Sequence, residues 1–175
     1  ALPVALATLA SPRNLVSGTW HVARLLHPEE RCAWGAVAVN IALARFLLGH
    51  RDFVPDVIEA LRMNEAPADL IEVVRQVPLR RREDLPVMRE PAGHVLHTVE
   101  VALWFAWHEP KLERGLVWIA NAGGDTDTNA AVAGALLGAR DGEDAIPARW
   151  LAAVRDTDHL AGLAEGLLGI SRGTG

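Results

Sequence analysis

The stretch from Pro28 to Gly49 constrains the fold more than any other part of the chain. A proline followed by acidic residues is typical of a helix start, and a glycine is a common helix stop. Between these two ends the predicted helix is apolar on nearly every side. Asn40 and Arg45 interrupt the apolar run, which is also too short to span a membrane. A helix that is apolar all round has to be surrounded by other elements, so we expect it at the centre of a helical fold.

Helical signals continue through most of the remaining sequence, and no stretch of strand-like alternation persists. Proline, glycine and capping residues predict further helices at about 12–26, 53–63, 67–76, 94–108, 111–121, 126–140, 147–155 and 157–169. Residues 77–92 contain three prolines and the run Arg80-Arg81-Arg82, which is followed by two acidic residues. We therefore expect a long loop there, with the arginines in solvent. At 175 residues, the chain is predicted to be a single all-α domain, residues 1–175.

Composition excludes several classes of function. The net charge of −5 argues against a general affinity for nucleic acid. Cys32, as the sole cysteine, cannot form an internal disulfide, which fits a reducing cytoplasm. The start of the chain has no basic segment followed by an apolar one, and no apolar run reaches membrane length. We expect a cytoplasmic protein with neither nucleic acid nor membrane as a partner.

The segment from Asn121 to Asn129 contains the strongest candidate ligand residues in the sequence. It reads Asn-Ala-Gly-Gly-Asp-Thr-Asp-Thr-Asn and runs directly into an alanine-rich helix. Residues two apart on a formed helix point roughly 200° away from each other, so Asp125 and Asp127 can converge only on the entry turn. The preceding Gly-Gly pair permits such a turn because glycine tolerates positive φ. Carboxylate and hydroxyl oxygens without nearby cysteine or histidine suit Mg²⁺, Mn²⁺ or Ca²⁺ and do not suit zinc.

Three interpretations of this segment compete. The first is a plain helix cap, although one aspartate or threonine would suffice for that. The second is an EF-hand loop, which fails because Ala130 stands where glycine is needed and Leu136 where a bidentate glutamate is needed. The third is a carboxylate half-site for a Mg²⁺-type ion that also holds a substrate. Two full carboxylates outweigh the partial charge of the helix end, about half a unit, and the amides there would attract a phosphate.

Other polar and aromatic residues carry weaker signals. His94, His97 and Glu100 share a helical face, but the segment lacks a further strong ligand at zinc spacing, so we favour an ordinary first helical turn. The tryptophans at helical spacing are assigned to the core and given no stacking role. Gly134 and Gly138 lie on one face of a predicted helix and are expected to allow close helix approach.

Three segments together resemble a known family. Gly123-Gly124-Asp125-Thr126-Asp127-Thr128, with the alanine- and glycine-rich helix after it, is similar to the carboxy-terminal signature of the ADP-ribosylglycohydrolases, typified by the dinitrogenase-reductase-activating glycohydrolase. Leu26-His27-Pro28-Glu29 is similar to the family's Thr-His-Pro segment, with leucine where threonine is usual. Gly93-His94-Val95-Leu96-His97-Thr98, leading into Ala-Leu-Trp, is similar to a third family stretch. The likeness covers most of the chain, from about Pro3 to Leu168.

The resemblance implies a compact orthogonal multi-helix bundle and metal-dependent hydrolysis of the bond between ADP-ribose and a protein side chain or small acceptor. It implies Mg²⁺ or Mn²⁺, as a dinuclear site in the complete protein, with Asp125, Asp127 and Thr128 as ligands. His27, Gly123 and Gly124 are implied to contact the substrate. Family members also carry Gly-Asp and Thr-Asp-Asp segments, a phosphate loop and the catalytic carboxylate toward the amino terminus, and none of these occurs here. We therefore assign no catalytic residue and expect the carboxy-terminal half of the fold, with a non-catalytic ADP-ribose or metal-binding module as the alternative.

Overall fold

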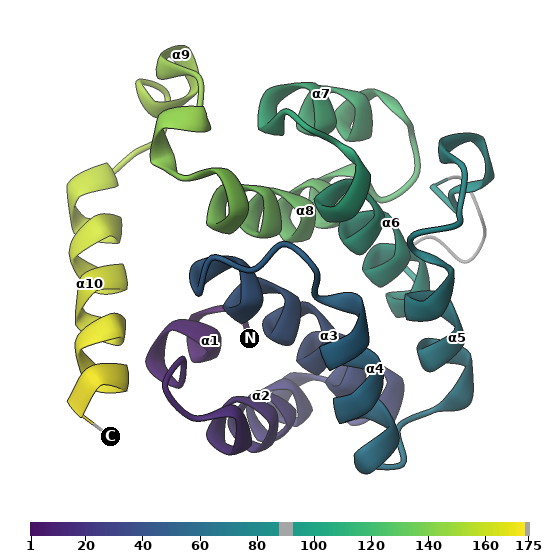
Figure 1. Ribbon diagram of the computed structural model, residues 1–175. Helices are drawn as coiled ribbons and strands as arrows, with labels where there is room; N and C mark the ends of the chain where they lie inside the picture. Colours follow the sequence, from purple (N-terminus) through teal and green to yellow (C-terminus); the bar gives the residue numbers. More distant parts are fainter. Residues whose placement is uncertain (88–92, 174–175) are drawn as a thin grey trace.

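The computed structural model describes residues 1–87 and 93–173, and every regular element in these ranges is helical (Figure 1). This confirms the all-α prediction. The elements in chain order are α1 (Pro3–Ala7), α2 (Pro12–Leu26), α3 (Glu30–Leu47), α4 (Val54–Met63), α5 (Ala68–Gln76), the 3₁₀ turn η1 (Arg82–Asp84), α6 (Val95–His108), α7 (Leu112–Asn121), α8 (Thr126–Asp141), the 3₁₀ turn η2 (Glu143–Ala145), α9 (Ala148–Leu151) and α10 (Thr157–Gly173).

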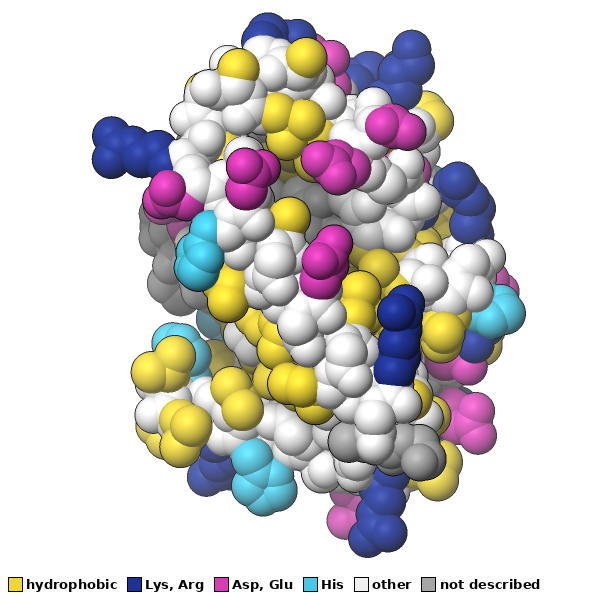
Figure 2. All heavy atoms as spheres, turned by 90° about the vertical axis from the view of Figure 1, so that its left-hand side faces the viewer, with side chains coloured by type: hydrophobic (Ala, Val, Ile, Leu, Met, Phe, Trp, Pro, Cys, Tyr) yellow, Lys and Arg dark blue, Asp and Glu magenta, His cyan; other side chains and the backbone are white. Residues whose placement is uncertain are grey.

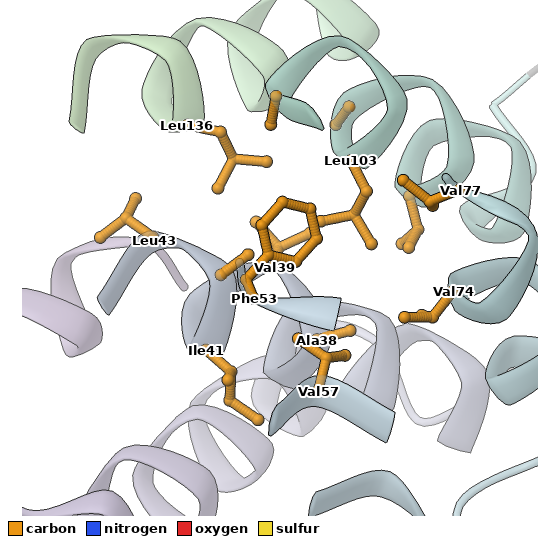
Figure 3. Packing of buried hydrophobic residues seen from close by; sticks show 14 of the residues in the cluster. Ala38, Val39, Ile41, Leu43, Phe53, Val57, Val74, Val77, Leu103 and Leu136 are labelled. Carbon is orange, nitrogen blue, oxygen red and sulfur yellow. The ribbon is translucent and has the colours of Figure 1, made fainter. Parts of the chain in front are cut away.

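Helix α3 lies at the centre, as predicted. It packs against α1, α2, α4, α6 and α8, and nearly all of its side chains from Val37 to Phe46 are buried. Figure 3 shows Val39 and Leu43 of α3 in the same cluster as Leu103 of α6 and Leu136 of α8. The apolar all-round pattern thus finds partners on every side. Within residues 1–87 and 93–173, no helix combines the length and apolarity needed to cross a bilayer.

The predicted helix boundaries hold to within about two residues from α2 to α8, and they fail at the two ends of the chain. Helix α1 was not predicted, because five residues are too few to show a helical period. Helix α9 ends at Leu151, well before the predicted 155. Asp156 adopts φ +59, a left-handed conformation that breaks the helix before α10 begins. Helix α10 then continues to Gly173, beyond the predicted 169.

Helix α10 forms one edge of the molecule, seen at the left of Figure 1, and packs against α1. The Ala10 backbone N–H donates a hydrogen bond to Ser171 Oγ at 2.9 Å and ties the end of α10 to the turn between α1 and α2. Leu160, Leu163 and Ile170 remain more than half exposed along this edge. Figure 2 shows hydrophobic side chains on the same face.

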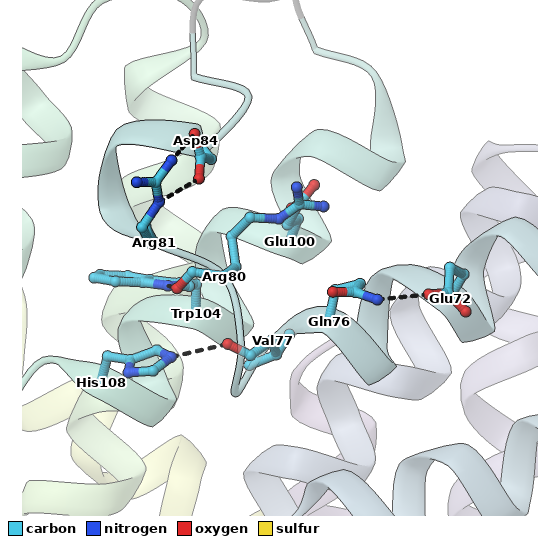
Figure 4. Close-up of polar contacts among 9 residues, drawn as sticks. All are labelled: Glu72, Gln76, Val77, Arg80, Arg81, Asp84, Glu100, Trp104 and His108. Atoms are coloured by element: carbon cyan, nitrogen blue, oxygen red, sulfur yellow. Dashed lines mark hydrogen bonds and ion pairs between the residues drawn. The ribbon is translucent and has the colours of Figure 1, made fainter.

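The part of the predicted long loop that the structure describes, residues 77–87, is anchored to the fold, and the rest of it, 88–92, lies outside the described residues. Arg80 Nε lies 2.7 Å from Glu100 Oε1, and Arg82 lies 3.5 Å from Glu109, and both glutamates are almost fully buried in the fold. Arg81 is the arginine of the run that stays mostly in solvent, and it pairs with Asp84 (Figure 4). The expectation of three solvated arginines is therefore wrong for two of them, because buried carboxylates on α6 and just after it need cationic partners.

Two aromatic side chains of α6 bind the backbone of the same segment. Trp104 Nε1 donates to the Arg80 carbonyl at 2.8 Å, and a ring nitrogen of His108 lies 2.8 Å from the Val77 carbonyl (Figure 4). The two rings stack with centroids 4.7 Å apart. The segment 77–87 is thereby fixed along α6, and Trp104, 4% exposed, belongs to the core as predicted.

Close helix approach occurs at a different glycine from those predicted. A Cβ at Gly134 would stand 3.5 Å from Leu116, an ordinary contact, and a Cβ at Gly138 would meet nothing within 4 Å. At Gly35 of α3, by contrast, a Cβ would lie 2.9 Å from Cγ2 of Val95 and 3.1 Å from Cγ2 of Val99. The shortest of these distances belongs to the approach of α3 to α6, which brings the start of α6 next to the centre of the fold.

Candidate functional site

The turn before α8 is built on two consecutive glycines. Gly123 and Gly124 have φ of +81° and +72°, conformations that L side chains rarely adopt. Asp125 follows in a non-helical conformation, φ −81° and ψ 67°, and its carbonyl accepts the N–H of Asn129 at 3.1 Å. Asp125 therefore occupies the N-cap position, and the helix begins at Thr126. The predicted entry turn is present.

Asp125 and Asp127 are neighbours at the start of α8, with Asp127 as the exposed second residue of the helix. A hydrogen bond with the Asp125 carboxyl, and then hydrogen bonds from the backbone N–H groups of Thr128 and Asp127, hold the pKa of the Asp127 carboxyl below its usual value. The Asp125 side chain makes no capping hydrogen bond to α8, so plain capping does not account for it. Two ionised carboxylates in contact repel each other, and a shared proton or a bound cation removes that repulsion.

A cavity of about 480 Å³ opens beside the carboxylate pair. Its wall combines the start of α8 with the end of α2, the middle of α3 and the start of α6. Polar groups come from Asp125, Thr128 and His27, and apolar side chains come from Val39 and Val132. The lining residues are Ala1, Leu2, His27, Cys32, Gly35, Ala36, Val39, Asn40, Gly93, Val95, Thr98, Val99, Asp125, Thr128 and Val132.

The structure brings three of the six predicted site residues to this cavity. His27, at the end of α2, is exposed and lines it together with Asp125 and Thr128, although about a hundred residues separate them in sequence. Asp127 is exposed and joins the group through its contact with Asp125. Gly123 and Gly124 form the turn that presents both carboxylates.

The donor set fits a hard cation. Two carboxylates and one hydroxyl on a single helical entry are oxygen ligands of the type that Mg²⁺ and Mn²⁺ accept. In the described ranges, no group of three or more histidine, cysteine, aspartate or glutamate side chains is placed to hold a metal ion. A hard cation takes about six oxygens, so water, substrate or another segment has to supply the rest.

The histidine pair at the start of α6 has local roles. His94 Nδ1 accepts the backbone N–H of Leu96 at 3.3 Å and so caps α6, as the first-turn interpretation requires. The rings of His94 and His97 lie 5.0 Å apart, and Glu100 is the ion-pair partner of Arg80. This arrangement does not form a zinc site in the described residues.

Several residues of the cavity were not predicted from the sequence to belong to the site. Asn40 is buried on α3 and donates from Nδ2 to Thr19 Oγ1 at 2.8 Å and to the Ala1 carbonyl at 3.0 Å, which fixes α1 and α2 against the cavity wall. Burial and, less strongly, Glu29 raise the pKa of the Cys32 thiol. Gly93 is the first residue of the third segment that resembles the family. The residues around it in sequence give no sign that it lies beside Asp125.

The helical fold is that of a known class of hydrolases. The model of the ADP-ribosylglycohydrolase family matches residues 1–175, and the chain belongs to this family. A solved structure titled ADP-ribosylglycohydrolase-related protein complex superimposes with a TM-score of 0.79 at 29% identity, over 96% of this chain and 57% of that one.

Two curated relatives have named activities. ADP-ribosyl-[dinitrogen reductase] glycohydrolase of Rhodospirillum rubrum is 27% identical over 150 residues, which are 86% of this chain and 47% of the relative. ADP-ribosylarginine hydrolase Tri1 of Pseudomonas putida is 36% identical over 76 residues, 43% of this chain and 20% of that protein. The chain thus spans about half the length, or less, of the proteins it matches.

Proposed function

We propose that this chain supplies the carboxy-terminal part of an enzyme that hydrolyses the glycosidic bond between ADP-ribose and a protein side chain or small acceptor, with Mg²⁺ or Mn²⁺. The observation that carries the proposal is that Asp125 lines the cavity without capping α8 and has Asp127 as its neighbour. Family membership and the names of the two relatives support the reaction class.

Each site residue has a role in this proposal. Asp125 and Asp127 act as carboxylate ligands of a dinuclear site, and the Thr128 hydroxyl adds a third oxygen. Bound Mg²⁺ or Mn²⁺ ions would hold ribose hydroxyls and lower the pKa of a bound water. His27, across the cavity, contacts ribose or phosphate, while Gly123 and Gly124 leave the backbone open to the substrate. The oxocarbenium-like transition state of glycoside hydrolysis depends on such positioning of ribose and water.

In this proposal, the remaining ligands and the acid/base carboxylate come from another segment. That segment would correspond to the part of the relatives that this chain does not match. The described residues offer three ligand side chains, against the roughly six oxygens that a hard cation needs. The same shortage favours the second candidate, a non-catalytic module that binds metal or ADP-ribose weakly. Turnover by the completed protein, as opposed to binding alone, separates the two.

The test uses Asp127→Asn, which keeps the size of the side chain and removes its charge. Asp158→Asn is the matched control, because Asp158 is the second residue of α10 just as Asp127 is the second residue of α8. We expect calorimetry to show weak Mn²⁺ binding by the parent and by Asp158→Asn, and none by Asp127→Asn. The free energy of unfolding of both variants should stay within about 1 kcal/mol of that of the parent, because a substitution at an exposed position leaves the core unchanged. Equal heats of Mn²⁺ binding in all three proteins would remove the carboxylate pair from the proposal.

A further inference from the structure

Gly93 lies next to the Asp125 carboxyl although the two are 32 residues apart in sequence. It precedes α6, lines the same cavity as Asp125 and has φ +74°. A Cβ at this position would stand 3.1 Å from Asp125 Oδ2 and 3.9 Å from its Cγ. The Asp125 carboxyl therefore has two close neighbours, the Asp127 carboxyl and Gly93, which carries no side chain.

The absent side chain matters because of what Asp125 Oδ2 would do. A contact of 3.1 Å is tighter than nine in ten real Cβ contacts, so a methyl group at position 93 would displace the carboxylate by a few tenths of an ångström. Mg²⁺-type ions accept little such error, because their oxygen ligands lie at about 2.0–2.1 Å in near-ideal octahedral geometry. The methyl group would also take up space where a water or a substrate hydroxyl could complete the coordination.

We propose that Gly93 is a positioning residue for the cation site: its lack of a side chain keeps Asp125 Oδ2 in place and open to a hard cation. The inference rests on the proposed function, since it assumes that Asp125 is a ligand. It adds a residue from the turn just before α6 to a site otherwise drawn from the α7–α8 turn.

A simple backbone requirement is the competing explanation, because alanine at a positive φ is strained wherever it occurs. Gly49 offers a matched control. It has φ +82° at the end of α3, and a Cβ there would meet nothing within 4 Å. Gly49→Ala therefore reproduces the strain of Gly93→Ala without the contact to a carboxylate.

The experiment compares Mn²⁺ affinity, by calorimetry, in the parent, Gly93→Ala and Gly49→Ala. We expect Gly93→Ala to bind about tenfold more weakly or worse, in the range seen when groups that support metal ligands are changed, and Gly49→Ala to bind like the parent. If Gly93→Ala binds like the parent, the inference is wrong while the proposed site stands. If the parent itself binds no Mn²⁺, the proposed metal site is wrong and the role of Gly93 falls with it.

Urea unfolding of the metal-free proteins gives a second readout. Gly93→Ala should destabilise the parent more than Gly49→Ala does. In an Asp125→Ala background the two costs should become equal, because the carboxylate that the methyl group would strike is gone. If the two substitutions destabilise the parent equally, the effect at position 93 is backbone strain alone, and the inference is overturned.

Discussion

Two ionised carboxyl groups close to each other repel unless a proton, a cation or hydrogen-bond donors offset their charge. Here Asp127 draws on backbone N–H groups of the first turn of α8, whereas Asp125 lacks a capping bond and faces the cavity. The Gly123-Gly124 pair was enough to predict the turn and the helix start after it, because both are local features, while the role of the two carboxylates as ligands stays a prediction.

Cys32 gives a prediction at the same scale. Its thiol lines the cavity, and burial, followed by Glu29, raises its pKa. Because the thiolate is the reactive form, the midpoint of the pH–rate profile for iodoacetamide alkylation should lie higher in the folded protein than in the protein unfolded in urea. The midpoint is the quantity to measure, since restricted access slows the reaction without moving it. A folded-state midpoint equal to or below the unfolded one would contradict the burial assignment.

The helices themselves were largely predictable from sequence, because their signals are local. Pro12 after Ser11 marked the start of α2, and the Ser11 hydroxyl accepts the N–H of Asn14 there. Long-range packing was not predictable. Gly134 and Gly138 looked suited to close approach, yet the tight contact lies at Gly35, whose partners on α6 are some 60 residues away. The anchoring of Arg80 on Glu100 was missed for the same reason.

The contact between α3 and α6 leads to a prediction about stability. In Gly35→Ala, the new methyl group would strike Val95 and Val99, and such overpacking costs about 1–3 kcal/mol. Gly166→Ala in α10 has nothing within 4 Å and should gain up to about 1 kcal/mol from helix propensity. Urea unfolding measures both. Adding Val99→Ala to Gly35→Ala should recover part of the loss. If Gly35→Ala proves as harmless as Gly166→Ala, α3 and α6 do not pack as tightly as the structure has them.

At the scale of the whole molecule, the site depends on elements that are distant in sequence. The end of α2, the middle of α3, the start of α6 and the start of α8 meet at one cavity. Periodicity and capping place each of these elements but say nothing about which ends meet. His27 was associated with the carboxylates only through the family resemblance, and Gly93, Asn40 and Cys32 were not associated with them at all. The cavity wall is a property of the tertiary packing.

Whether this chain can catalyse a reaction also depends on the molecule as a whole. Its relative from Rhodospirillum rubrum is about twice as long as the matched region. Three ligand side chains are also few for a hard cation, which takes about six oxygens. We therefore expect the 175-residue chain alone to release little or no free ADP-ribose from an ADP-ribosylated protein or small-molecule conjugate. Supplying the unmatched half of that relative, fused ahead of Ala1 or as a separate chain, should produce Mg²⁺-dependent release.

The control for this experiment is the same mixture carrying Asp127→Asn, which should stay inactive because one carboxylate ligand has lost its charge. Activity in that control would mean that the added half works without this site. Metal-dependent binding of ADP-ribose without turnover in the completed protein would favour the non-catalytic module. Strong hydrolysis by the 175-residue chain alone, unaffected by removal of divalent metal, would be incompatible with a shared metal site. In that case catalysis would have to come from side chains within residues 1–175, and Asp125 would become the first candidate for the acid/base role, because it lines the cavity without capping α8.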